Sequence, residues 1–74
     1  MSSFRIESNP AVMLGKPCIK GSRITVETLL RKLAAARSHL EILEDYPQLA
    51  PDDILAALAF AADYLQHETV LAAE

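Results

Sequence analysis

The stretch that decides the fold is Gly15–Val26, GKPCIKGSRITV. It contains both glycines, the single cysteine and three of the seven basic residues of the chain. Cys18-Ile19 and Arg23-Ile24 flank a three-residue turn in which Gly21 is free to adopt a positive φ, so the pattern predicts a small hairpin. Strands this short are marginal alone and need to lie on helices or on another chain.

The residues before this stretch read as a strand and turn segment. Phe4-Arg5-Ile6 alternates apolar and polar side chains, as a short strand does. Asn9-Pro10 is a turn pair, and residues 11–14 form either a strand or one turn of helix. Residues 1–24 are therefore predicted to be a β-element that leads into the helices.

Three helices follow, at residues 25–36, 38–45 and 51–68. Thr25 is a good N-cap for the first, and Ile24 and Leu29 occupy the positions of a hydrophobic staple. The second begins with a capping box made by Ser38 and Glu41. The third begins with Pro51, followed by Asp52 and Asp53 at the positive end of the helix dipole, although Ala50 offers no capping oxygen. Together these signals predict a mainly α, three-helix, helix-turn-helix-like bundle in a single domain, residues 1–74.

The third helix carries two apolar stripes. Ile54, Leu58, Ala61 and Leu65 are predicted to pack on the first two helices. Phe60, Tyr64 and Leu71 form a second stripe, which either closes the core against the N-terminal strands or contacts a partner or a second copy. A chain of 74 residues with 51% apolar residues is expected to gain stability from such a contact, so a homodimer or higher oligomer is predicted.

The sequence offers little for catalysis or cofactor chemistry. The histidines, Cys18 and nearby carboxylates do not form a set of metal ligands, and the two glycines do not make a phosphate loop. We therefore expect no catalytic residue, no metal and no cofactor. The N-terminus lacks the apolar run of a signal peptide, no stretch is long enough to span a bilayer, and a single thiol is typical of a reducing compartment. These features predict a cytoplasmic protein without a membrane partner.

Charge is divided unevenly along the chain, whose net charge is −3. Residues 1–37 hold all seven Lys and Arg and two acids, whereas residues 38–74 hold eight acids and no Lys or Arg. The basic half either faces nucleic acid or an acidic protein, or pairs with the acidic half in the fold or in a dimer.

A nucleic-acid contact would have to use the basic turn and first helix. The third helix begins with two aspartates and has no side chain suited to bases or phosphates before Gln66. The candidates for binding nucleic acid or a partner are Lys16, Lys20, Arg23, Arg31, Lys32 and Arg37. For Arg23 the competing interpretation is an ion pair with Asp45 or Asp53.

Residues 15–26 resemble the signature of family 433 of the domains of unknown function, roughly G-x-P-x-I-x-G-T-R-I-x-V. The similarity continues through Asp45-Tyr46-Pro47 to the alanine-rich segment 56–61, and covers about residues 5–65. Three positions depart from the family pattern: Ser22 replaces a threonine, Ala36 a glycine at the end of the first helix, and Ala50 a Thr or Ser cap.

The resemblance implies a homeodomain-like fold and a role in a toxin–antitoxin module. Members are often encoded beside a PIN-like nuclease, and some are called antitoxins of VapBC-type modules. We therefore expect a non-catalytic, VapB-type antitoxin-like protein that neutralises a PIN-like nuclease and also binds its own operator DNA. The alternatives are a stand-alone DNA-binding regulator, or an interaction protein of another kind.

Overall fold

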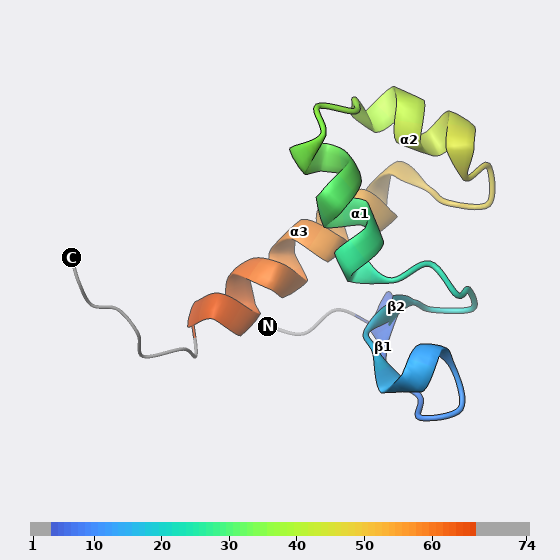
Figure 1. Cartoon of the computed structure of the whole chain (residues 1–74), viewed down its shortest axis with the longest axis vertical. Coiled ribbons are helices and arrows are strands. Elements are labelled where there is room, and N and C mark those ends of the chain that lie inside the picture. The colour runs from blue at the N-terminus through green and yellow to red at the C-terminus, as the bar shows by residue number, and fades with distance from the viewer. Residues whose placement is uncertain (1–3, 67–74) are drawn as a thin grey trace.

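The computed structural model describes residues 4–66 and shows a mainly helical chain with one small sheet (Figure 1). The elements in order are β1 (Ile6–Glu7), a 3₁₀ turn η1 (Met13–Gly15), β2 (Cys18–Ile19), α1 (Val26–Ala34), α2 (His39–Asp45) and α3 (Pro51–Gln66). The sheet lies beside the start of α1, and α3 crosses behind α1 and extends past it. Within residues 4–66, no helix is both long enough and apolar enough to cross a membrane.

The two-stranded sheet is antiparallel and pairs β2 with β1, with Ile6 opposite Ile19. The sequence predicted residues 23–24 as the partner of β2, and this is only partly right. The Ile19 N–H does donate to the Ile24 carbonyl at 2.9 Å. The Ile24 N–H, however, donates to Ser22 Oγ, which itself donates to the Ile19 carbonyl. Cys18 also forms an isolated antiparallel bridge with Thr25, where the Val26 N–H donates to the Pro17 carbonyl. The predicted hairpin is therefore held by this bridge, with Ser22 closing the turn of residues 20–24, and β1 supplies the second strand of the sheet.

Local chemistry sets the start of α1. The Thr25 hydroxyl accepts a hydrogen bond from the Thr28 N–H at 3.0 Å, as the sequence predicted for an N-cap. Ile24 and Leu29, the two staple residues, are both buried in the core. The predicted cap is therefore confirmed.

The end of α1 differs from the prediction, because the helix ends at Ala34 rather than at residue 36. Ala36 adopts φ 67°, in the left-handed region. Its N–H donates to the Leu33 carbonyl, and the Arg37 N–H donates to the Lys32 carbonyl. These two hydrogen bonds define a Schellman motif. The motif forms although alanine replaces glycine, so its Cβ is held in a conformation that costs about 1–2 kcal/mol for a non-glycine residue.

We expect Ala36→Gly to raise the free energy of unfolding by about 0.5–1 kcal/mol and Tm by about 3–6 °C. Glycine relieves the left-handed strain at this exposed residue, and the gain is partly offset by the greater freedom of glycine in the unfolded chain. Thermal unfolding followed by circular dichroism measures the change. The matched control is Ala34→Gly in the last turn of α1. This change should lower the free energy of unfolding by about 1 kcal/mol. Destabilisation by both changes would contradict the strain at Ala36.

The other two helices are capped by side chains close in sequence. The predicted capping box of α2 is present: Ser38 Oγ accepts from the Glu41 N–H, and the Ser38 N–H donates to the Glu41 carboxylate. At the start of α3, Asp53 accepts a hydrogen bond from the Ala50 N–H at 2.8 Å. Asp53 thus supplies the carboxylate half of a capping box, whereas Ala50 has no side-chain oxygen for the other half. The predicted end of α3 at residue 68 lies outside the described residues.

The core is built from one central residue of each helix. Leu29, Ile42 and Ile54 are fully buried, and Ile19, Ile24, Val26, Leu49 and Ala57 complete the cluster. The prediction that Leu58 and Leu65 pack on α1 and α2 is wrong, since both are exposed. The core face of α3 carries Ile54, as predicted, together with Asp53, Ala56 and Ala57. Asp53 is buried where it meets Arg5, and this ion pair fixes the rotation of α3.

Candidate functional site

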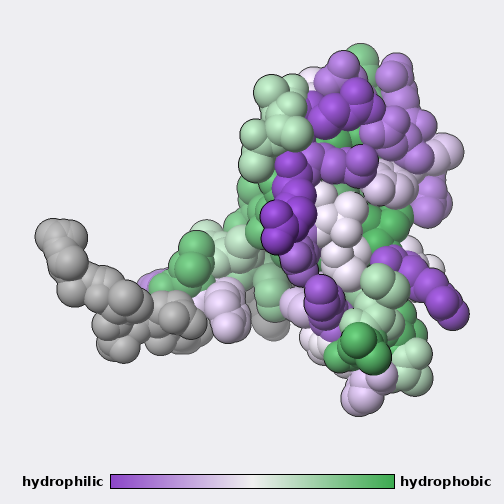
Figure 2. Space-filling model, in the orientation of Figure 1, coloured by the Kyte–Doolittle hydropathy of each residue, from purple (hydrophilic) through white to green (hydrophobic). Residues whose placement is uncertain are grey.

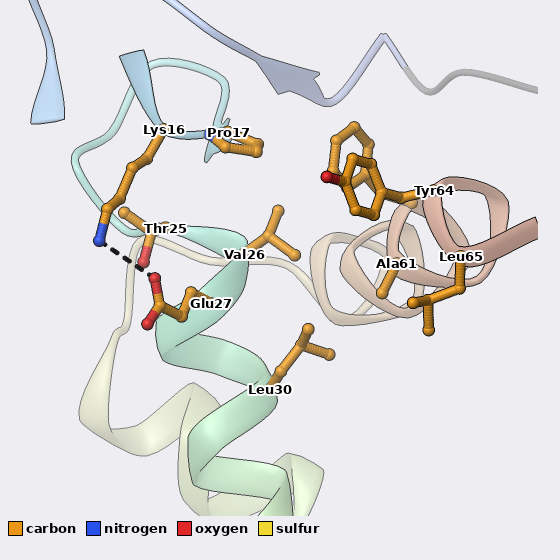
Figure 3. A pocket seen from close by; sticks show the side chains of 10 residues that line it. Lys16, Pro17, Thr25, Val26, Glu27, Leu30, Ala61, Tyr64 and Leu65 are labelled. Atoms are coloured by element: carbon orange, nitrogen blue, oxygen red, sulfur yellow. Dashed lines mark hydrogen bonds and ion pairs between the residues drawn. The ribbon is translucent and has the colours of Figure 1, made fainter. Parts of the chain in front are cut away.

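An open apolar groove lies between the first turns of α1 and the C-terminal half of α3 (Figure 3). Its volume is about 400 Å³. Its apolar lining is formed by Val26, Leu30, Phe60, Ala61, Tyr64 and Leu65. The groove is a concave surface that a ligand or a partner could occupy.

The walls of the groove follow from the spacing of residues on the two helices. Val26 and Leu30 are four residues apart on α1 and point toward α3 in Figure 3. Ala61 and Leu65 have the same spacing on α3 and form part of the facing wall. Ala61 is small, so it leaves a hollow between the longer side chains. Tyr64 is 61% exposed and pairs a large apolar ring with a polar hydroxyl, a combination enriched in protein interfaces.

A charged edge borders the groove on the α1 side. Lys16 Nζ donates to Glu27 Oε1 at 3.1 Å, and Arg31 donates to Glu27 Oε2 at 3.1 Å. The hydrogen bond from Lys16 and then that from Arg31 lower the pKa of Glu27 from its ordinary value of 4.5. Two cations around one carboxylate leave this edge with a net positive charge.

We expect Lys16→Met to raise the pKa of Glu27 more than Arg31→Met does, because Lys16 makes the largest contribution to lowering it. In the native chain, the stabilising contribution of Glu27 is complete above pH 4.5 and is lost as the pH falls through the lower pKa of the folded state. An NMR titration of the Glu27 carboxyl carbon measures all three values. A larger effect of Arg31→Met would contradict the ranking.

Most other basic residues pair with the acidic half of the chain. Arg5 contacts Asp53 at 2.9 Å and Asp52 at 3.6 Å. Arg37 and Lys32 both contact Asp45, and the hydrogen bond that Arg37 donates to Asp45 raises the pKa of Arg37. The uneven charge of the sequence is thus used within the fold, as one of the two interpretations predicted.

Lys20 and Arg23 are the exceptions. Both are exposed on the turn after β2, and within residues 4–66 neither forms an ion pair. The prediction that Arg23 pairs with Asp45 or Asp53 is wrong, because those carboxylates hold Arg37 and Arg5 instead. Of the six predicted basic site residues, Lys16 lines the groove and Arg31 pairs with Glu27, which also lines it. Lys32 and Arg37 pair with Asp45 of α2, and Lys20 and Arg23 remain available to a partner.

The residues predicted for a dimer or partner contact have different positions. Phe60 is half-buried against the core and lines the groove, so it does not belong to a free surface stripe. Tyr64 is exposed beside the groove. Leu71 lies outside the described residues. The sequence reasoning missed Val26 and Leu30 as groove residues, because their apolar spacing equally fits the core side of α1.

The acidic, histidine and cysteine side chains of the described residues were compared with the arrangement that a metal ion requires. No group of three or more His, Cys, Asp or Glu side chains in residues 4–66 is arranged to hold a metal ion. Cys18 is buried, and its thiol donates to the Lys16 carbonyl. The lining of the groove is mostly apolar, so its chemistry suits an apolar surface.

Comparison with known proteins finds matches to one family. The model of the family described as protein of unknown function (DUF433) matches residues 6–61. The crystal structure of a DUF433 member protein from Anabaena variabilis ATCC 29413 is similar, with a TM-score of 0.79 and 29% sequence identity. The alignment covers 84% of this chain and 61% of that chain, so this chain spans about three fifths of the other. No curated protein gives a significant match.

Proposed function

This chain belongs to the DUF433 family, and from that premise we propose that it is a non-catalytic, antitoxin-like protein that binds and neutralises a PIN-like nuclease. The observation that carries the proposal is the open apolar groove between α1 and α3. The family resemblance of residues 5–65 supplies the class of partner. A module of this kind acts in the cytoplasm, where a single reduced thiol such as Cys18 is stable.

The chemistry of the groove favours one kind of occupant, an amphipathic helix of the nuclease. Such a helix inserts apolar residues spaced three and four apart into a groove between helices. Val26, Leu30 and Ala61 offer apolar contacts, and Tyr64 offers an anchor at the rim. The edge made by Lys16, Glu27 and Arg31 is net positive, so the docked helix should carry a carboxylate beside its apolar face.

The proposal is tested with the product of the neighbouring gene. Co-expression and co-purification should recover a complex, and expression of this chain should relieve the toxicity of that product. Tyr64→Ala should weaken the complex at least about 30-fold, as expected for loss of a buried aromatic anchor. The matched control is Leu40→Ala on α2, because Leu40 is 66% exposed and lies outside the groove.

Two outcomes would overturn the proposal. One is the absence of both a complex and relief of toxicity. The other is a complex in which Tyr64→Ala and Leu40→Ala have equal effects, which would place the contact elsewhere. We expect circular dichroism of each variant to match that of the native chain, because both substituted side chains are largely exposed.

We propose operator DNA binding as a second candidate function, supported by Lys20 and Arg23. These two cations lie on one exposed turn, and within the described part of the chain neither is neutralised by a carboxylate. A homeodomain-like arrangement of the three helices is part of this proposal. The N-terminus of α3 would make a poor reading element, because Asp52 and Asp53 would be repelled by phosphates.

Gel shifts on the promoter of the gene test DNA binding. Lys20→Ala combined with Arg23→Ala should weaken binding and reduce the slope of log affinity against log salt by about 2. Lys16→Ala combined with Arg31→Ala removes the same charge from residues already paired with Glu27, so its effect should be smaller. Equal effects of the two double variants would reject the turn as the DNA contact.

A further inference from the structure

Helix α3 has a second apolar face, opposite the core. Leu55, Leu58 and Leu65 are 54%, 39% and 65% exposed, and Ala62 is exposed between them. Leu65 lies at the edge of this face and also lines the groove. In Figure 2 the part of α3 that extends past α1 shows mostly hydrophobic surface, whereas α1 and α2 show mostly hydrophilic surface. A helix that is apolar on both faces is normally buried on both faces.

The spacing of these four residues is that of a helix–helix seam. Positions 55, 58, 62 and 65 are separated by three, four and three residues, which is the a/d pattern of a coiled coil. We propose that this face, the outer α3 stripe (Leu55, Leu58, Ala62 and Leu65), is the seam of a homodimer in which two copies of α3 pack antiparallel about a twofold axis.

The side chains of the stripe are complementary to those of a second copy. Twofold antiparallel packing centred near residue 60 places Leu58 opposite Ala62 of the other copy, and Leu55 opposite Leu65. Each Leu58 side chain then fills the space beside the small Ala62 of the other copy, so that the side chains of the two helices interdigitate. The twofold axis makes each of these contacts occur twice, as an isologous interface requires.

Charge also favours a second copy in the antiparallel direction. The residues that flank the stripe at helical spacing are Asp52, Ala59 and Gln66 on one side and Ile54 and Ala61 on the other. In an antiparallel pair centred near residue 60, Asp52 lies near Gln66 of the other copy, so two copies meet there without repulsion between like charges. A parallel pair would set the two Asp52 side chains and the two helix dipoles side by side, whereas the antiparallel pair separates the aspartates and opposes the dipoles.

The size of the stripe indicates a dissociable dimer. The seam runs from residue 55 to residue 65, about 16 Å of helix. An interface of this length is smaller than the standard stable one, which buries about 800 Å² per partner, so the dimer should dissociate in roughly the micromolar range. The inference does not depend on the identity of any toxin or operator, and its test uses the chain alone.

Sedimentation of the purified full chain over a range of concentrations tests the dimer. The native chain should change from monomer to dimer below about 1 mM. Leu58→Asp should raise the dissociation constant at least about 100-fold, because each copy would bury an unpaired carboxylate at the seam. Leu40→Asp, the same change at an exposed leucine of α2, should leave it unchanged. A monomer at all concentrations, or a dimer equally sensitive to both variants, would overturn the proposal.

Chemical cross-linking tests the geometry independently of stability. Ala59→Cys places a thiol on the flank of the stripe, where an antiparallel dimer brings the two copies of residue 59 to the same side. A short bismaleimide should join this variant into covalent dimers. It should not join Ala35→Cys, at the exposed end of α1, nor the native chain, whose Cys18 is buried. Cross-linking of Ala35→Cys in preference to Ala59→Cys would also overturn the proposal.

Discussion

Leu29→Ala is expected to lower the free energy of unfolding by about 3–5 kcal/mol, the largest loss we predict for this chain. Leu29 is 0% exposed and lies in the same cluster as Ile42 and Ile54, the buried residues of the other two helices. Truncation therefore removes apolar burial and leaves a cavity where the three helices meet. A domain of 74 residues has a total stability of roughly 4–11 kcal/mol, so the variant should be close to unfolded at room temperature.

Urea unfolding followed by far-UV circular dichroism measures this loss. Leu40→Ala is the matched control, because it makes the same change in a helix at a side chain that is 66% exposed. We expect the control to change stability by less than about 0.5 kcal/mol. A loss of similar size in the two variants would show that Leu29 does not occupy the centre of the core.

Asp53→Ala is expected to lower the free energy of unfolding by about 2–3 kcal/mol, the second largest effect that we predict. One oxygen of Asp53 accepts a hydrogen bond from Arg5 at 2.9 Å, and the other accepts one from the Ala50 N–H at 2.8 Å. The side chain is only 11% exposed, so solvent screens these contacts little. The substitution removes both the cap of α3 and the ion pair that joins α3 to the start of β1.

The matched control for this change is Asp52→Ala. Asp52 also lies near Arg5, at 3.6 Å, but its side chain is 68% exposed, and we expect a loss below about 1 kcal/mol. A double-mutant cycle of Arg5→Ala with Asp53→Ala then isolates the coupling of the buried pair. Additive effects of the two single changes would contradict a structural role for the ion pair.

Helix starts were predicted well, because the groups that define them lie within three residues of each other. Thr25 caps α1 through the Thr28 N–H, and Ser38 and Glu41 cap α2 through reciprocal hydrogen bonds. These interactions depend only on local spacing. The end of α1 was missed by two residues, since the sequence alone did not indicate that an alanine would accept the left-handed conformation at position 36.

The candidate sites were predicted less well. Lys20 and Arg23 were two of the six basic residues predicted to bind a partner, with an ion pair inside the fold as the alternative for Arg23, and the structure leaves both exposed. It did not identify the groove, because Val26 and Leu30 belong to a stripe that also faces the core. It also assigned Leu58 and Leu65 to the core, whereas the structure leaves both exposed. For Phe60 it left open a core or a partner contact, and the structure packs Phe60 partly against the core.

Neighbouring residues along the chain therefore specify the three helices and the caps that begin α1 and α2. Tertiary packing alone selects β1 as the partner of β2, pairs Arg5, Lys32 and Arg37 with carboxylates of α2 and α3, and sets the rotation of α3. The physical reason is that α3 is apolar on both faces, so its hydrophobic pattern does not distinguish the inner face from the outer one. The choice depends on Asp53, which is stable inside only where Arg5, 48 residues away, reaches it.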